Sequence, residues 1–95
     1  YYYLVTDIIN LNKDEFIKLA PNPFVNNINF DFTILNYPTL NVEIFDLAQG
    51  VLVAAKPNVY AGTSLYVGQL AGGTYLIRVS SPDGKITKQF KMIKL

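Results

Sequence analysis

The amino-acid sequence predicts an all-β protein, a single immunoglobulin-like β-sandwich of about seven short antiparallel strands. Apolar and polar residues alternate in several short windows, which is the period of a half-buried strand. Turn-forming residues recur about every 8–12 positions, the spacing expected of a small sandwich. With 95 residues, of which 51% are apolar, the chain is long enough for one domain with a small core.

The first 15 residues mix apolar side chains with asparagine, lysine and acidic residues. We interpret residues 1–15 as a linker or the end of a preceding cargo domain, with a short strand at the opening tyrosines, and residues 16–95 as the domain itself. There is no initiator methionine, basic segment or cleavage motif. We therefore expect the chain to be part of a longer polypeptide, with any export signal lying outside it.

The first two strands of the domain are predicted at residues 16–20 and 27–34. Pro21, Asn22 and Pro23 end the first strand, because proline cannot donate to a strand ladder and pushes the preceding residue into extended geometry. These three residues should form a stiff corner. The second strand has the clearest alternation of the chain, and its buried face is predicted to carry Ile28, Phe30, Phe32 and Ile34.

The middle of the chain contains three further predicted strands. Residues 40–44 alternate again, and residues 46–50 form the turn that follows. Residues 51–55 are continuously apolar, which fits a strand covered on both faces, and residues 56–58 (Lys-Pro-Asn) should break it. A weaker strand follows at residues 64–67.

The chain closes with a predicted β-hairpin. A strand over residues 73–80 leads into a turn at residues 81–84, where Pro82 fixes φ and Gly84 permits a positive φ. A return strand then follows to residue 95.

Lysines repeat every three residues along this return segment, at Lys85, Lys88, Lys91 and Lys94. That period also suits an amphipathic helix, but the segment follows a hairpin turn and has no helix cap, so a strand is preferred. On a strand these lysines fall on both faces. They indicate either a solvated edge or a surface that an acidic partner recognises.

The composition argues against several classes of function. A net charge of +1 gives no concentrated basic surface for nucleic acid. The chain has neither cysteine nor histidine, so thiolate metal sites, disulfides and the usual general base are missing. We predict no enzyme activity, no catalytic residue, no cofactor and no metal site.

Three weaker alternatives were weighed against surface or core roles. Asp31, Glu43 and Asp46 are the carboxylates that might pair as acid and base, but outward positions on strands normally hold solvated residues. A calcium site with Asp83, Asp46 or the asparagines would need more oxygen ligands in one loop than the sequence offers. A sugar-binding aromatic face would consist of Tyr37, Tyr60, Tyr66 and Tyr75.

The order and spacing of several segments resemble a known family. Pro-Asn-Pro-Phe at residues 21–24 precedes the alternating strand, and Val-Glu-Ile-Phe-Asp-Leu (residues 42–47) and Gly-Thr-Tyr-Leu-Ile-Arg-Val (residues 73–79) follow, before the lysine-rich close. Together they look like the type A C-terminal sorting domain of the Bacteroidetes type IX secretion system (Por secretion system). The resemblance covers residues 16–95. Two places depart from the usual pattern, the turn at residues 48–50 and the pair at residues 71–72.

The resemblance implies a C-terminal secretion signal that directs an exported cargo through the outer-membrane translocon. The implied partners are that translocon, its β-barrel shuttle protein and a surface sortase, which removes the domain or exchanges it for a surface anchor. The implied location is the periplasm in transit, then the cell surface or the medium. The alternative is a non-catalytic fibronectin-like or carbohydrate-binding module of a cell-surface protein.

The resemblance also assigns the residues that the translocon and its shuttle would recognise. They are Pro21, Asn22, Pro23, Gly73, Tyr75, Arg78, Lys85, Lys88 and Lys91. Another protein can bind a preformed terminal strand with a free edge by pairing a strand of its own with that edge. We therefore expect Gly73, Arg78 and the terminal strand to contribute most to recognition.

Overall fold

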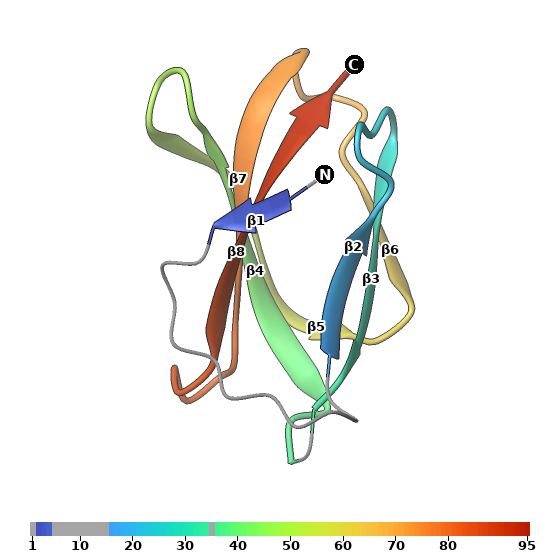
Figure 1. The fold of residues 1–95 in the computed structure, drawn as a ribbon, viewed down its shortest axis with the longest axis vertical. Helices are drawn as coiled ribbons and strands as arrows, with labels where there is room; N and C mark the ends of the chain where they lie inside the picture. The colour runs from blue at the N-terminus through green and yellow to red at the C-terminus, as the bar shows by residue number, and fades with distance from the viewer. Residues whose placement is uncertain (1, 5–15, 35) are drawn as a thin grey trace.

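The computed structural model describes residues 2–4, 16–34 and 36–95, and it shows two antiparallel sheets packed face to face (Figure 1). The larger sheet has the order β1 (Tyr2–Leu4), β8 (Thr87–Lys94), β7 (Gly73–Ser80), β4 (Thr39–Asp46) and β5 (Val51–Tyr60). The smaller sheet has the order β2 (Phe16–Ala20), β3 (Asn27–Thr33) and β6 (Thr63–Tyr66). The predicted β-sandwich is confirmed, including the short strand at the opening tyrosines.

The core lies between the sheets and follows the alternation of the sequence. In β3, buried and exposed residues alternate along the whole strand, so that its apolar side chains point inward and its polar ones into solvent. Strand β7 buries Tyr75, Ile77 and Val79 in the same way. The largest fully buried side chains come from both sheets and include Phe24, Phe30, Leu40, Ile44, Ile77, Phe90 and Met92.

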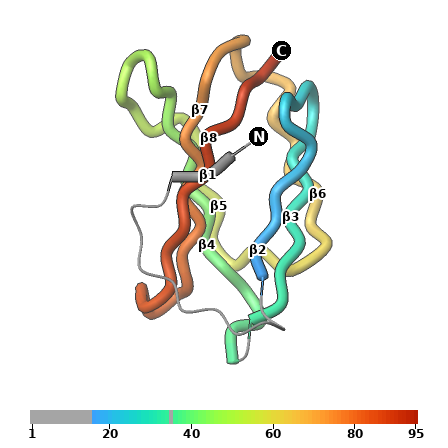
Figure 2. The backbone as a smooth tube through the Cα atoms, in the orientation of Figure 1, coloured from blue at the N-terminus to red at the C-terminus, as the bar shows by residue number. Residues whose placement is uncertain are grey.

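The connections gather at two ends of the sandwich (Figure 2). One end carries the β2–β3 corner, the β6–β7 loop and the last residues of the chain. The β7–β8 turn lies at the opposite end. This layout places the proline-containing corner beside the C-terminal residues, although they are far apart in sequence.

The prediction that residues 51–55 are covered on both faces is wrong. Strand β5 is the outermost strand of the larger sheet, and of the described strands it pairs with β4 alone. Val51, Leu52 and Val53 are 46%, 50% and 38% exposed. A run of apolar residues shows that a strand can be buried. It does not show whether another sheet packs against both faces of that strand.

The prediction that residues 56–58 end this strand is also wrong, because β5 continues to Tyr60. The register shifts between Leu40 and Val42, so that Pro57 and Asn58 have no direct partner on β4. Asn58 adopts a positive φ of 57°, and its N–H donates to Oδ1 of Asn41 at 3.1 Å. The bulge and the edge position together accommodate a proline that a central strand would exclude.

The return segment of the hairpin is a strand, as preferred over a helix, but its edge is not free along its length. Strand β8 pairs with β7 on one side, and with β1 on the other side at Gln89, Phe90 and Lys91. The expectation of a free terminal edge is therefore corrected. The opposite edge of the larger sheet belongs to β5, which has no partner on that side among residues 2–4, 16–34 and 36–95.

Most of the predicted linker, residues 5–15, lies outside the described residues, so its boundary with the domain remains a prediction. Within the part of the chain that the structure describes, no helix has the length and hydropathy needed to cross a membrane.

Candidate functional site

The corner between β2 and β3 is bonded to the end of β8. Oδ1 of Asn22 accepts a hydrogen bond from the N–H of Ile93 at 3.0 Å. The N–H of Phe24 donates to the Ile93 carbonyl at 2.9 Å, and the N–H of Leu95 donates to the Phe24 carbonyl at 3.0 Å. We call residues 21–24 and 93–95 together the clasp. It joins the smaller sheet to the last strand of the larger one.

The sequence of the corner explains why it bonds in this way. Pro21 and Pro23 have no N–H, so Asn22 and Phe24 provide the polar groups that face the strand. The Phe24 ring is fully buried and lies 6.2 Å from the Tyr75 ring, centroid to centroid. Burying a phenylalanine side chain contributes about 1.5–3 kcal/mol, more than any one of these hydrogen bonds.

Gly73 and Tyr75 lie at the same end of the sandwich. Gly73 pairs with Lys94 and has a φ of +156°, a conformation that a side chain would strain. The Tyr75 side chain is 3% exposed, and its hydroxyl donates to the Ala71 carbonyl at 2.6 Å. Burial raises the pKa of this hydroxyl. Both residues shape the loop that leads into β7.

Arg78 lies apart from the clasp, on the outer face of the larger sheet. Its side chain forms an ion pair with Glu43, directly opposite on β4, with an Nη2–Oε1 distance of 2.8 Å and an Nε–Oε1 distance of 2.9 Å. The guanidinium also lies 5.0 Å from the centre of the Phe45 ring. Both charged side chains are more than a third exposed, so this pair contributes at most about 1 kcal/mol to stability. It does, however, hold the arginine in one orientation.

The outer faces of the two sheets differ in character. On the larger sheet, Arg78 lies over half-buried Phe45, whose cross-strand partners are half-buried Leu76 on β7 and exposed Leu52 on β5. On the smaller sheet, the outward residues of β3 are polar and exposed: Asn27, Asn29, Asp31 and Thr33. The flanking strands β2 and β6 add exposed Phe16, Lys18 and Tyr66 to the outer face of the smaller sheet, so what distinguishes the larger sheet is its ion-paired arginine beside Phe45.

The predicted lysine series does not form one surface. Lys85 lies in the β7–β8 turn, and Lys91 pairs with Leu76 and Tyr2. Lys88 points the same way as Phe90, with its Nζ 5.5 Å from the ring centre, and burial lowers its pKa. Lys94 is buried, and its Nζ donates to the Leu95 carbonyl at 3.1 Å. The lysines thus fall on both faces of β8, as predicted.

The β7–β8 turn is held by its own polar residues. Asp83 accepts hydrogen bonds from the Tyr37 hydroxyl at 2.6 Å, from the Ser81 hydroxyl at 2.7 Å and from the Lys85 N–H at 3.0 Å. These bonds, the one from Tyr37 first, lower the pKa of Asp83 to about 2. The same bond to Asp83 raises the pKa of Tyr37.

The structure therefore divides the site residues among three places. Pro21, Asn22, Pro23, Gly73 and Tyr75 meet at the clasp end. Arg78, Lys88 and Lys91 lie on strands β7 and β8 of the larger sheet, and Lys85 lies in the turn at the opposite end.

Sequence reasoning left Phe24, Glu43 and Phe45 out of the site residues. For Phe24 a signal was present, because a large apolar residue directly follows the two prolines of an otherwise polar corner.

The alternatives weighed from sequence gain little from this geometry. Within the described ranges, no three acidic, histidine or cysteine side chains come together as a metal site would require. Asp46 instead accepts from the backbone N–H of Ala48 and Gln49 in its turn. Of the four tyrosines, Tyr75 is buried and Tyr37 is bonded to Asp83, so they do not form one exposed face.

Comparison with known protein families gives a match over most of the chain. The family model described as the secretion system C-terminal sorting domain matches residues 18–94 of the chain. No curated protein and no solved structure matches.

The clasp predicts a specific loss of stability. Replacing Asn22 with alanine leaves the N–H of Ile93 without its acceptor, so the Asn22→Ala variant should lose about 1 kcal/mol of unfolding free energy in urea denaturation. Asn22→Asp, which keeps an acceptor oxygen, should recover part of that loss. The control Asn27→Ala removes an exposed asparagine from β3 and should change little. Equal stability of the Asn22→Ala and Asn27→Ala variants would contradict the clasp.

The turn predicts a pH-dependent contribution from Asp83. The folded pKa of about 2 lies below the ordinary 3.8, so the carboxylate stabilises the fold above about pH 4, and this contribution disappears as the pH falls toward 2. The Asp83→Asn variant should therefore be less stable than the unmodified chain near pH 6, and the difference in stability should shrink toward zero near pH 2. Thermal denaturation across this range, with Asp31→Asn as the control, measures the difference. A constant gap between the Asp83→Asn variant and the unmodified chain would rule the contribution out.

Proposed function

The chain belongs to the family of secretion system C-terminal sorting domains, and on that premise we propose that its folded surface directs an exported cargo through the type IX outer-membrane translocon. The family is one of secretion signals and not an enzyme family. Such a signal has to be recognised by another protein, and recognition requires a surface that the folded domain presents to that partner before binding.

The observation that supports this function most strongly is the fixed position of the terminal strand. Strand β8 is held by β7, by β1 and by the clasp, which leaves its last residues little freedom. A surface that is already ordered has less conformational entropy to lose when it docks. A signal domain that its receptor recognises by shape therefore binds more tightly when its terminal strand is already ordered.

We propose that Arg78 is the central recognition residue on the outer face of the larger sheet. Its ion pair with Glu43 contributes little to stability, yet it fixes the guanidinium beside Phe45. Arginine beside half-buried apolar residues is a common composition of binding hot spots. Gly73 and the residues of the clasp would act indirectly, by keeping β7 and β8 in place.

The later steps follow the pattern of the family. The domain would be read in the periplasm by the translocon and its β-barrel shuttle protein, and a surface sortase would then remove it or exchange it for a surface anchor. A binding module with the same fold, the alternative function, would not need to direct export.

A transfer experiment tests the proposed function. Residues 1–95 fused to the C-terminus of a fluorescent protein with an export signal, in a bacterium with a type IX system, should bring fluorescence to the cell surface or the medium. Retention in the periplasm would refute a sorting role and favour the binding module.

The same reporter tests Arg78. Arg78→Ala should reduce secretion severalfold while lowering the unfolding free energy by no more than about 1 kcal/mol. Lys18→Ala, on the outward side of β2, is the matched control and should leave secretion unchanged. Secretion of the Arg78→Ala reporter at the full level would remove Arg78 from the recognition surface.

A further inference from the structure

Among the strands that the structure describes, β5 forms an edge without a second partner, and this edge lacks the usual protection. Edge strands of natural proteins carry charges or prolines that prevent pairing with other chains. Lys56 and Pro57 serve this purpose in the second half of β5, but residues 51–55 are Val-Leu-Val-Ala-Ala, without charge, proline or glycine. Because β4 is the only strand of the described residues that pairs with β5, its other edge offers backbone donors and acceptors to an incoming strand.

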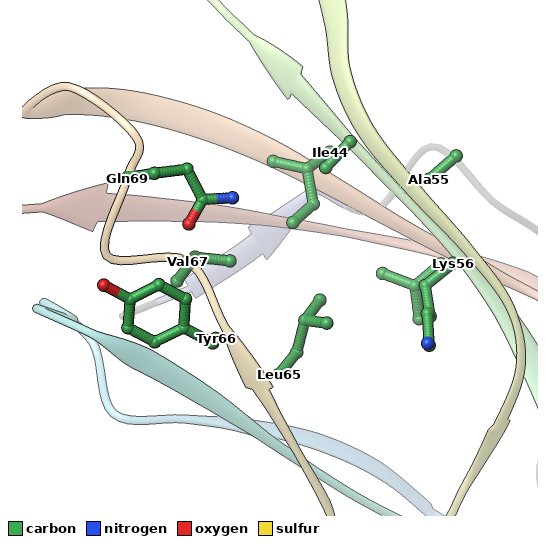
Figure 3. Close-up of a pocket in the computed structure, with 9 residues that line it drawn as sticks. Ile44, Ala55, Lys56, Leu65, Tyr66, Val67 and Gln69 are labelled. Carbon is green, nitrogen blue, oxygen red and sulfur yellow. The ribbon is translucent and has the colours of Figure 1, made fainter.

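A cavity opens between this edge and the neighbouring edge strand β6 (Figure 3). It has a volume of about 120 Å³, and its walls include Ile44 and Leu65, which point toward each other from the two sheets. An apolar cavity of roughly 150 Å³ holds a molecule the size of benzene, so this one suits a single aliphatic side chain.

The cavity exists because β5 places small or charged residues on its inward side. Ala54 lies opposite Ile44, and Lys56 lies opposite Val42, so the two inward positions of β5 beside the cavity supply little apolar volume, whereas Val59, further along β5, is buried outside it. A second register shift lies between Ile44 and Phe45 and leaves Val53 without a direct partner on β4. The larger apolar residues, Val51 and Leu52, remain exposed.

Charge adds a further requirement for the occupant. Lys56 lines the cavity, is exposed, and forms no ion pair with any residue that the structure describes. An acidic side chain beside it would complement the ammonium group. The edge itself is neutral, so the rest of an incoming segment should be apolar and uncharged.

We propose that an extended segment of the secretion machinery adds to β5 as a further strand of the larger sheet. Its main chain pairs with residues 51–55, one apolar side chain enters the cavity, and an acidic side chain lies beside Lys56. This is recognition by strand addition, in which the main chain supplies affinity and side-chain pockets supply selectivity. The inference rests on the proposed function and names the chemistry of its partner.

A substitution on β5 whose larger side chain fills the cavity tests the proposal. Ala54→Leu occupies the space that the incoming side chain would take, so the domain should keep its melting temperature or gain from the burial, while secretion of the fused reporter should fall about tenfold or more. Ala61→Leu adds the same atoms in the exposed β5–β6 turn, outside the cavity, and should be secreted normally. Normal secretion of a folded Ala54→Leu reporter would overturn the inference while leaving the sorting function intact. Failure of the unmodified reporter would instead remove the sorting function.

A photo-crosslinking residue at position 53 supplies a second readout. It should capture a component of the secretion machinery in cells, and the capture should disappear in the Ala54→Leu background. The same residue at position 31, on the outer face of the opposite sheet, should not capture that component. Capture of a second copy of this chain, together with a dimer in solution that Ala54→Leu dissociates, would replace the proposed partner with self-pairing. Equal capture of the component from positions 53 and 31 would also overturn the proposal.

Discussion

The arrangement of this protein depends on the docking of one short corner against the end of the chain. Asn22 and Phe24 bond to Ile93 and Leu95, and the Phe24 ring closes the same end of the core. A sandwich of this size buries a limited area between its sheets, so a link between the first corner and the last strand constrains both. Strand β8 is paired with β7 and β1, and its last residues are held in addition by a segment some 70 positions earlier.

This arrangement separates residues that shape the domain from residues that a partner can reach. The clasp, Gly73 and Tyr75 set the positions of β7 and β8. Arg78 presents a fixed charge on the outer face, and the neutral edge of β5 offers main-chain groups. A signal that carries no chemistry of its own can work through such surfaces, provided that the fold beneath them is rigid.

Local patterns predicted most of the strands, because alternation and turn residues act over a few positions. The alternation of β3 and the Pro82–Gly84 turn are examples, and both are found in the structure. The errors concern neighbours that the local sequence does not specify. Residues 51–55 look like a covered strand, yet the second sheet has only three strands and does not cover them. The clasp and the Glu43–Arg78 pair join distant segments, so their partners were not predicted from spacing.

The claim that the terminal strand is ordered before any partner binds is tested most directly by native-state hydrogen exchange of the isolated chain. The N–H groups of Ile93 and Leu95 are bonded to Asn22 and Phe24. They should exchange as slowly as core amides of β7, such as that of Ile77, which exchange by global unfolding. Exchange of Ile93 and Leu95 at the rate of an unstructured peptide would show that the chain end is free, and would contradict this account.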